Sequence, residues 1–229
     1  MLSRFAAIGA LLCAPLSACT ATVAGTASPG PPVPPATTET LPSFLLSASD
    51  VGAVMSSDDI AVVRDVDAFW NDAARLDNVD CLAIAGTAQQ AVYADSDATA
   101  THSQVLREPP TSPAWSHYAV QAVVLFPTSQ AAAAFFETSR SSWAGCSDRE
   151  LRYPQPIGEA QRWSVGSIST DHDVLAVSRT EQAPDRWSCQ RALTVRSNVA
   201  IDVEACSLEG PMAGATAIAR QITNRLPAA

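Results

Sequence analysis

The stretch WSCQRALTVRSNVAIDVEAC, residues 187–206, predicts a β-hairpin that is closed across its base by its own two cysteines. β-Branched residues are frequent in both halves, and Ser197-Asn198 lies between them; asparagine tolerates the positive φ that a two-residue hairpin turn requires. With the turn at these residues, Cys189 lies directly opposite Cys206 in a non-hydrogen-bonded pair, where Cα atoms approach to about 4.5 Å. That separation suits a disulfide.

The same register gives the hairpin two different faces. Arg191 lies opposite Glu204, which makes an opposite-charge pair on the face of the cysteines. The other face is apolar and is expected to pack on a core; its residues are Ala192, Val199, Ile201, Val203 and Ala205. The disulfide and the charge pair therefore agree on one register.

Composition limits the class of protein. The chain has 229 residues, of which 47% are hydrophobic, so one ordinary domain with a real core and a tail is expected. The formal net charge is −9. A nucleic-acid or anionic-lipid binder usually presents a basic face, so this balance argues against both kinds of partner.

The first 19 residues predict export. Residues 1–18 have one positive charge, a short apolar run and small residues before Cys19. Leu16-Ser17-Ala18-Cys19 is similar to the lipobox of bacterial lipoproteins, in which the peptidase cuts before the cysteine and the thiol is lipidated. We therefore expect a lipoprotein signal peptide over 1–18 and a chain anchored to the membrane at Cys19, facing the extracytoplasmic side. An ordinary signal peptide cut after Ala18 is the alternative.

Four cysteines remain for the folded part once Cys13 is removed and Cys19 is lipidated. Outside the cytoplasm an even number predicts disulfides. The hairpin register pairs Cys189 with Cys206 and leaves Cys81 to pair with Cys146. A zinc site or four free thiols is the alternative, and the absence of any C-x-x-C pair argues against it.

Proline, threonine, alanine and glycine dominate the segment that follows the lipobox. We expect residues 19–43 to be a tether with polyproline II tendency, and residues 44–229 to be the folded domain.

Within the domain, periodicity predicts an α+β fold. Helices are expected over 48–55, from residue 81 to about 92, over 128–146 and from Pro211 to Leu226; strands are expected over 60–66, 99–107, 116–126, 162–169 and 174–180, followed by the hairpin. Cys81 and Cys146 fall on the buried faces of two helices, so their disulfide would join those helices over one face of the sheet. Strands in hairpins with helices around them favour a mostly antiparallel sheet over a parallel βαβ fold.

The sequence contains none of the familiar catalytic or nucleotide-binding motifs. Asp171-His172-Asp173 could orient a histidine base, but its position between two strands favours a solvated turn. His102 and His117 have no acidic or cysteine neighbour at ligand spacing. We therefore predict no enzyme activity, no metal and no cofactor.

Aromatic residues give the candidates for a ligand cleft. Arg162-Trp163 and Arg186-Trp187 could form stacked pairs at a binding surface, with core packing as the alternative. Trp115 lies beside a proline-rich loop and close to Tyr118, where it could rim a groove. The cleft candidates are Trp115, Tyr118, Arg162 and Trp163.

The span from about Leu45 to Leu226 resembles the extracellular sensor domain of PknH-type mycobacterial serine/threonine kinases. The resemblance rests on Cys81 with Val92-Tyr93, on QVLREP from residue 104, on VQAVVLFP from residue 120, on WAGC at 143–146 and on the pattern WxCQRALxVRxNVxIDVxAC at 187–206. It implies a mixed α/β domain with two disulfides and a cleft for an unidentified extracytoplasmic ligand. A lipobox precedes the domain here, so we expect no fused kinase.

These features together predict a lipid-anchored, non-catalytic protein that binds or senses a small extracytoplasmic ligand. The alternative is an accessory lipoprotein that binds another protein of the cell envelope.

Overall fold

We describe the fold from a computed structural model, which describes residues 34–108, 116–184, 186–208 and 214–227. In this part of the chain, nine strands form one antiparallel sheet in the order β1-β2-β3-β9-β8-β7-β5-β4, with β6 paired to β7. The strands are β1 Ala61–Val66, β2 Ala100–Arg107, β3 His117–Leu125, β4 Glu150–Tyr153, β5 Gln161–Val165, β6 Ser169–Asp171, β7 Val174–Glu181, β8 Trp187–Arg196 and β9 Val199–Leu208. The predicted α+β, mostly antiparallel fold is confirmed.

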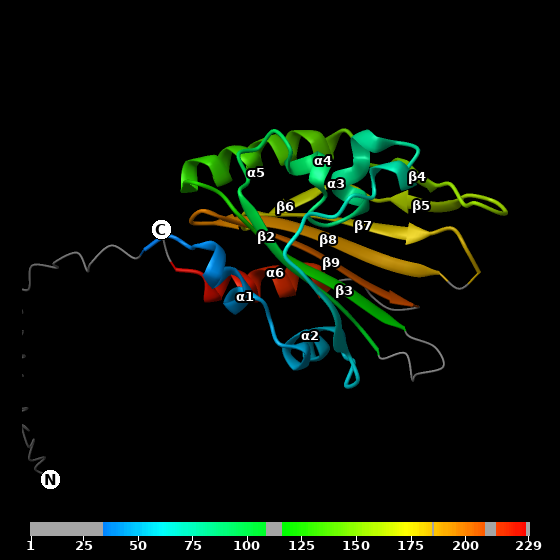
Figure 1. The fold of residues 1–229 in the computed structure, drawn as a ribbon. Coiled ribbons are helices and arrows are strands. Elements are labelled where there is room, and N and C mark those ends of the chain that lie inside the picture. The colour runs from blue at the N-terminus through cyan, green and yellow to red at the C-terminus, as the bar shows by residue number, and fades with distance from the viewer. Residues whose placement is uncertain (1–33, 109–115, 185, 209–213, 228–229) are drawn as a thin grey trace, which may run out of the picture. The chain divides into compact units, whose positions relative to one another are not determined.

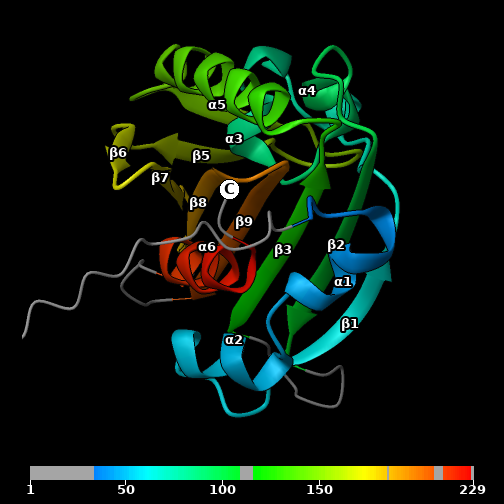
Figure 2. The same cartoon turned by 90° about the vertical axis from the view of Figure 1, so that its left-hand side faces the viewer.

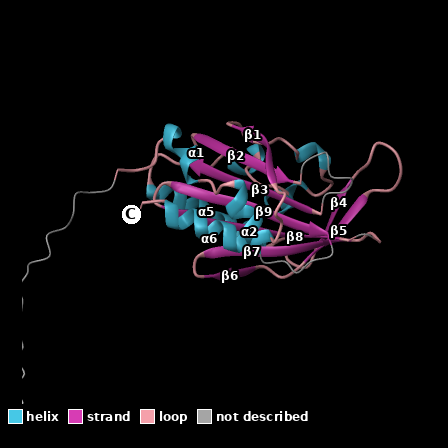
Figure 3. Cartoon of the chain, turned by 90° about the horizontal axis from the view of Figure 1, so that it is seen from below, coloured by secondary structure: helices cyan, strands magenta, loops and turns pink. Residues whose placement is uncertain are grey.

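Helices cover both faces of the sheet (Figures 1 and 2). On one face lie α5 (Ser129–Ala144) and the short helices α3 (Leu82–Ala85) and α4 (Gln90–Tyr93); on the other lie α1 (Leu41–Phe44), α2 (Ala48–Met55) and α6 (Gly214–Arg225). Single 3₁₀ turns occupy Thr38–Thr40, Ala73–Arg75 and Val79–Cys81. Figure 3 shows α1, α2 and α6 in front of the strands. The sheet therefore separates two cores.

The β8–β9 hairpin has the predicted register. Cys189 lies opposite Cys206, Arg191 opposite Glu204 and Arg196 opposite Val199. Of the two turn residues, Ser197 takes the positive φ, 53°, instead of Asn198. The Asn198 side chain is buried, and its amide bonds both the N–H and the C=O of Ala36 at 3.0 Å.

That contact changes the boundary expected between tether and domain. Residues 36–43 pack on the sheet, with Ala36 and Leu41 buried in the same core as α6. The folded unit therefore begins before residue 44, because the buried turn amide of Asn198 finds its partner in a segment whose composition predicts only a spacer. Residues 1–33, which include Cys19, lie outside the described residues.

Two of the predicted helices begin at side-chain N-caps. Ser47 accepts a hydrogen bond from Asp50 N–H at the start of α2, and Thr128 accepts one from Ala131 N–H at the start of α5. The apolar stripe of the last helix is buried at Ala215, Ile218, Ala219, Ile222 and Leu226. The predicted start of this helix, Pro211, lies outside the described residues.

The continuous helix predicted from residue 81 to 92 is wrong. The chain leaves α3 at Gly86, turns at Ala88 with a φ of +44°, and resumes as α4 only at Gln90. Between these helices Gln89 makes a parallel bridge with Trp70. A short edge strand, β4, was also not predicted; its Leu151 is fully buried.

Both disulfides join the predicted cysteines. Cys81 bonds Cys146, with a Cα–Cα distance of 5.8 Å, and so ties the Val79–Cys81 turn to the end of α5. Cys189 bonds Cys206 across the hairpin, with a Cα–Cα distance of 4.0 Å.

Candidate functional site

A cavity of about 480 Å³ opens beside the cross-strand disulfide, between one end of the sheet and the segment that contains α3. Such a volume lies in the range of about 300–1,000 Å³ that is typical of small-molecule sites. Its walls come from β3, β4, β5, β7, β8 and β9 and from residues 72–89: Asp72, Arg75, Leu76, Leu82, Ala85, Gly86, Gln89, Tyr118, Tyr153, Gln161, Trp163, Arg179, Trp187, Cys189, Glu204 and Cys206.

Arg179 is the buried cation of the cavity wall. Its guanidinium donates to Glu204 at 2.6 Å and to the Tyr153 hydroxyl at 2.7 Å, and it lies 5.2 Å from the centre of the Trp163 ring. Burial by itself would lower the pKa of Arg179, but Glu204 and Tyr153 together more than offset this, so the pKa is raised. For the Tyr153 hydroxyl, burial raises the pKa, because the neutral form is the one that burial favours. Arg179 is therefore charged, and three neighbours fix its position.

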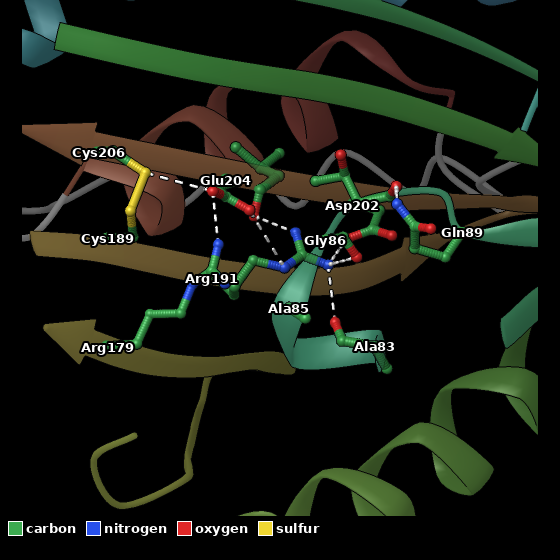
Figure 4. A network of polar contacts seen from close by, with 12 residues as sticks. Ala83, Ala85, Gly86, Gln89, Arg179, Cys189, Arg191, Asp202, Glu204 and Cys206 are labelled. Carbon is green, nitrogen blue, oxygen red and sulfur yellow. Dashed lines mark hydrogen bonds and ion pairs between the residues drawn. A yellow bond between two sulfur atoms is a disulfide. The ribbon is translucent and has the colours of Figure 1, made fainter. Parts of the chain in front are cut away.

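A second arginine lies deeper in the same network (Figure 4). Arg191 is 1% exposed; it donates to Asp202 at 2.6 Å, and its Nε lies 4.0 Å from Glu204. Two arginines and two carboxylates thus alternate under the cavity, and their charges cancel. Buried ion pairs of this kind persist only when each partner is also hydrogen-bonded.

This network also explains the break after α3. Arg191 donates to the carbonyls of Ala83 and Gly86 at 3.0 and 3.1 Å, and Asp202 accepts the N–H of Ala88 at 2.8 Å. A continuous helix would use those backbone groups internally. The buried charges of the hairpin therefore hold the chain between α3 and α4 in its non-helical course, and Gly86 and Gln89 there line the cavity.

Aromatic and planar polar groups form the rest of the walls. Trp163 is nearly buried, whereas Tyr118, Tyr153 and Trp187 are partly exposed. Burial raises the pKa of Tyr118, so its hydroxyl stays protonated. At the rim, the partly exposed Asp72 and the buried Gln89 exchange two hydrogen bonds: Asp72 N–H donates to Gln89 Oε1 at 2.9 Å, and Gln89 Nε2 donates to Asp72 Oδ2 at 3.0 Å. Gln89 Nε2 also donates to the Thr87 carbonyl at 3.3 Å. The arrangement offers flat apolar surfaces beside fixed donors and acceptors.

The structure brings two of the four predicted cleft residues to this cavity. Tyr118 and Trp163 line it. Arg162, the residue before Trp163 on β5, does not line the cavity. Its side chain is exposed and lies 3.4 Å from Glu150 of the edge strand β4. Trp115 lies outside the described residues. Whether Tyr118 and Trp163 bind a ligand stays a prediction.

Sequence reasoning missed the polar residues of the cavity. Arg179 and Glu204 occupy alternating positions of strands, where a charge usually faces water. The opposed Arg191 and Glu204 of the hairpin were the one available signal that this face holds charges, and Glu204 in fact bonds Arg179 more closely than Arg191.

The histidines lie elsewhere. His172 is an exposed turn residue, as predicted. His102 and His117 are not isolated from acids, contrary to the prediction: His102 Nδ1 lies 2.7 Å from Asp67, and His117 Nδ1 lies 2.5 Å from Glu108. The pairing of β1 with β2 brings Asp67 to His102, and the pairing of β2 with β3 brings Glu108, just after β2, to His117 at the start of β3. The spacing of these residues in the sequence does not reveal these contacts.

Only one group of described residues has three potential metal ligands within 4.8 Å of one another, namely Cys189, Glu204 and Cys206. Both sulfurs are bonded to each other, so neither is a thiolate that could bind a metal. Within the described part of the chain, no helix has the length and apolar character needed to cross a membrane.

Fold and site together define a class: an antiparallel α+β domain, stapled by two disulfides, with an aromatic and polar cavity over a buried charge network. The family model for the PknH-like extracellular domain matches residues 36–225. The chain therefore belongs to the family of PknH-like extracellular domains.

Individual relatives agree with this assignment. The chain is 30% identical over 187 residues to the serine/threonine-protein kinase PknH of Mycobacterium bovis, and 31% identical over 178 residues to that of Mycobacterium tuberculosis strain H37Rv. These matches cover 82% and 78% of this chain but only 31% and 28% of the relatives. The crystal structure of the extracellular domain of PknH from M. tuberculosis superposes with a TM-score of 0.77 at 29% identity, covering 84% of this chain and 97% of that one.

Proposed function

We propose that this protein is a ligand-binding, sensor-type domain without catalytic activity of its own, held at the outer side of the cell membrane by a lipid on Cys19. The cavity beside the Cys189–Cys206 disulfide is the observation that carries the proposal. It combines a volume suited to a small molecule with aromatic walls and fixed polar groups, which is the usual composition of a ligand site.

Family membership supports the location and the absence of catalysis. The family model and the matched crystal structure both concern an extracellular domain. Two disulfides fit an oxidising compartment. Arg75 pairs with Asp72, Arg179 pairs with Glu204 and the Tyr153 hydroxyl, and the described lining contains no histidine, serine or threonine to act as a base or nucleophile.

Ligand binding is tested by thermal unfolding of the full chain in the presence of fractionated cell-envelope extract. An active fraction should raise the melting temperature of the wild-type protein and of Arg162→Ala, whose side chain lies outside the cavity. The double variant Tyr118→Ala with Trp187→Ala should lose the shift. If no fraction shifts the wild type, or if the double variant responds like the wild type, the proposal fails.

The lipid anchor is tested by metabolic labelling with an alkyne fatty acid in a bacterium that processes lipoproteins. Cys19→Ala should abolish both the label and sedimentation with membranes, because it removes the thiol that is proposed to be lipidated and with it the acyl chains that stable anchoring needs. Cys13→Ala is the matched control and should keep both. Equal labelling of the two variants would refute anchoring at Cys19.

The alternative function, an accessory protein that binds an envelope partner, has weaker support. Among described residues the only adjacent exposed large hydrophobic side chains are Val62 and Val63 on the edge strand β1, and a pair of exposed valines is common on monomeric proteins. Crosslinking through β1 in intact cells that captures one protein partner, together with failure of every extract in the thermal test, would favour this alternative.

A further inference from the structure

The charges that line the cavity cancel in pairs. Four charged side chains are among its described lining residues, two of each sign. Arg179 and Glu204 are 2.6 Å apart and nearly buried, while Arg75 and Asp72 form an exposed pair at 3.5 Å on the rim. Beneath them Arg191 and Asp202 make a third pair. A ligand with a net charge would therefore meet a wall without a net counter-charge, or would have to separate a buried ion pair, which is costly.

The apolar part of the wall is made of flat surfaces. Two tryptophans and two tyrosines contribute, together with Leu76, Leu82 and the disulfide. An aromatic ring has a negative face, which attracts weakly positive C–H groups as well as full cations. Arg179 already lies against Trp163, so one such face is used by the protein itself.

The polar part of the wall offers donors and acceptors side by side. Asp72 and Gln89 are held by their mutual hydrogen bonds, yet a carboxylate has about four acceptor sites and only some are used. Arg75 has five N–H donors, of which Nη1 contacts Asp72, and its side chain is 76% exposed. Gln161 also lines the cavity and donates to Glu181. Groups that both donate and accept, such as hydroxyls, suit this rim best.

We infer that the cavity binds an uncharged saccharide, with the C–H face of a sugar ring against the aromatic wall and its hydroxyls at the Asp72–Gln89 rim. This inference rests on the proposed ligand-binding function and specifies the chemistry of its ligand. A neutral ring with one apolar face and a hydroxyl edge satisfies the charge balance, the flat walls and the mixed rim together. An anionic or a cationic ligand satisfies at most two of these.

The experiment compares sugars of the same size and different charge on the full chain. The neutral probes are trehalose, maltose, cellobiose, mannobiose and N,N′-diacetylchitobiose; the cationic probe is de-acetylated chitobiose, and the anionic probe is a glucuronic-acid disaccharide. Saturation-transfer NMR and tryptophan fluorescence measure binding. We expect at least one neutral disaccharide to bind at least tenfold more tightly than both charged probes. Tighter binding of either charged probe, or equal binding of all three kinds, overturns the inference.

Two pairs of variants test the contacts. Trp187→Ala should weaken binding of the neutral sugar at least tenfold, whereas Trp187→Phe, which keeps a ring face, should stay within about threefold of the wild type. Asp72→Asn removes acceptor sites inferred to bond the sugar hydroxyls and leaves Arg75 without its counter-charge; it should weaken neutral binding at least threefold and strengthen binding of the uronic-acid disaccharide at least fivefold. Asp77→Asn is the matched control, because Asp77 forms a similar exposed pair with Arg152 at 3.6 Å outside the cavity. Unchanged binding by Trp187→Ala would contradict the inferred site.

The results separate this inference from the proposed function. If no disaccharide binds while an envelope fraction still raises the melting temperature of the wild type, the saccharide inference fails and the ligand-binding function stands. If neither the sugars nor any fraction bind, both fail.

Discussion

The two faces of the β8–β9 hairpin are both buried, but by side chains of different chemistry. The face toward α6 is mainly aliphatic, with Ala192, Val199, Ile201, Val203 and Ala205 essentially inaccessible to solvent, and its Gln190 accepts a hydrogen bond from Thr216 N–H of α6. The face toward α3 and α5 presents the disulfide, Arg191, Asp202 and Glu204, which are buried as well. The first face depends mostly on the volume and shape of its side chains. The second depends on specific partners for its charged groups.

This difference explains where the candidate site lies. An aliphatic core closes on itself, because any close-packed arrangement of its side chains removes them from water. The charged groups of the other face (Figure 4) instead hold the backbone of Ala83, Gly86 and Ala88 and the hydroxyls of Tyr93 and Tyr153 by hydrogen bonds. Arg179 and Glu204 of this network line the cavity. Both faces of the hairpin are therefore buried, and the charged face also fixes the positions of groups around the candidate site.

The strongest test of this contrast removes one charge from the polar face. Asp202→Ala leaves the Arg191 guanidinium buried without its carboxylate, and Tyr93 and Ala88 lose their acceptor. We expect a loss of about 3–5 kcal/mol of unfolding free energy, measured by urea denaturation of the full chain. Asp171→Ala removes an exposed carboxylate that lies at the same 2.6 Å from Arg220, and should cost less than about 1 kcal/mol. Equal losses in the two variants would refute the assigned role of burial.

The second test removes covalent links on the polar face. Replacing Cys81 and Cys146 together by alanine should cost about 4 kcal/mol, and replacing Cys189 and Cys206 about 3 kcal/mol, because the sequence separations they close are 65 and 17 residues. Equilibrium denaturation of the two double variants gives the values. A smaller loss for the longer loop would show that native contacts, not loop closure, decide the order.

The third test concerns the aliphatic face. Ile201→Val removes one methylene from a fully buried side chain, so a loss of about 1 kcal/mol is expected. Asp202→Asn, one position along the same strand, keeps the shape of the side chain but removes the carboxylate nearest to Arg191, and should cost more. Urea denaturation of both variants checks the order. The contrast between the faces fails if the apolar substitution is the more costly one.

The smallest effect is expected at a carboxylate outside both faces. Glu108 accepts hydrogen bonds from Ser57, Ser116 and His117. Burial alone would raise the pKa of Glu108, but the bonds from His117 outweigh it and the pKa is lowered from 4.5 to about 2. A lowered pKa stabilises the fold above pH 4.5, and this contribution is lost as the pH falls from about 4.5 to 2.

Because solvent reaches His117, the contribution is on the order of 1 kcal/mol. Glu108→Gln should therefore be less stable than the wild type at pH 6 and match it near pH 2. A constant difference over that range, measured by denaturation at each pH, would contradict the assignment.

The sequence was sufficient for features that depend on local pattern. Alternation of side chains and a two-residue turn determine the register of the hairpin, and the register places Cys189 against Cys206. Helix caps at Ser47 and Thr128 and the apolar stripe of α6 are equally local. The antiparallel α+β class and the family resemblance follow from the same stretches.

Tertiary structure alone decided the cavity and the break between α3 and α4. Helical periodicity continues through Ala88, yet the chain turns there because Arg191 and Asp202, more than 100 residues away, bind its backbone. Likewise Arg179 and Tyr153 meet only because β7 and β4 lie on the same side of β8. Periodicity reports which side of one element is buried, whereas the partner of a buried charge depends on how distant elements pack, and that is why the sequence determined the hairpin and the structure decided its site.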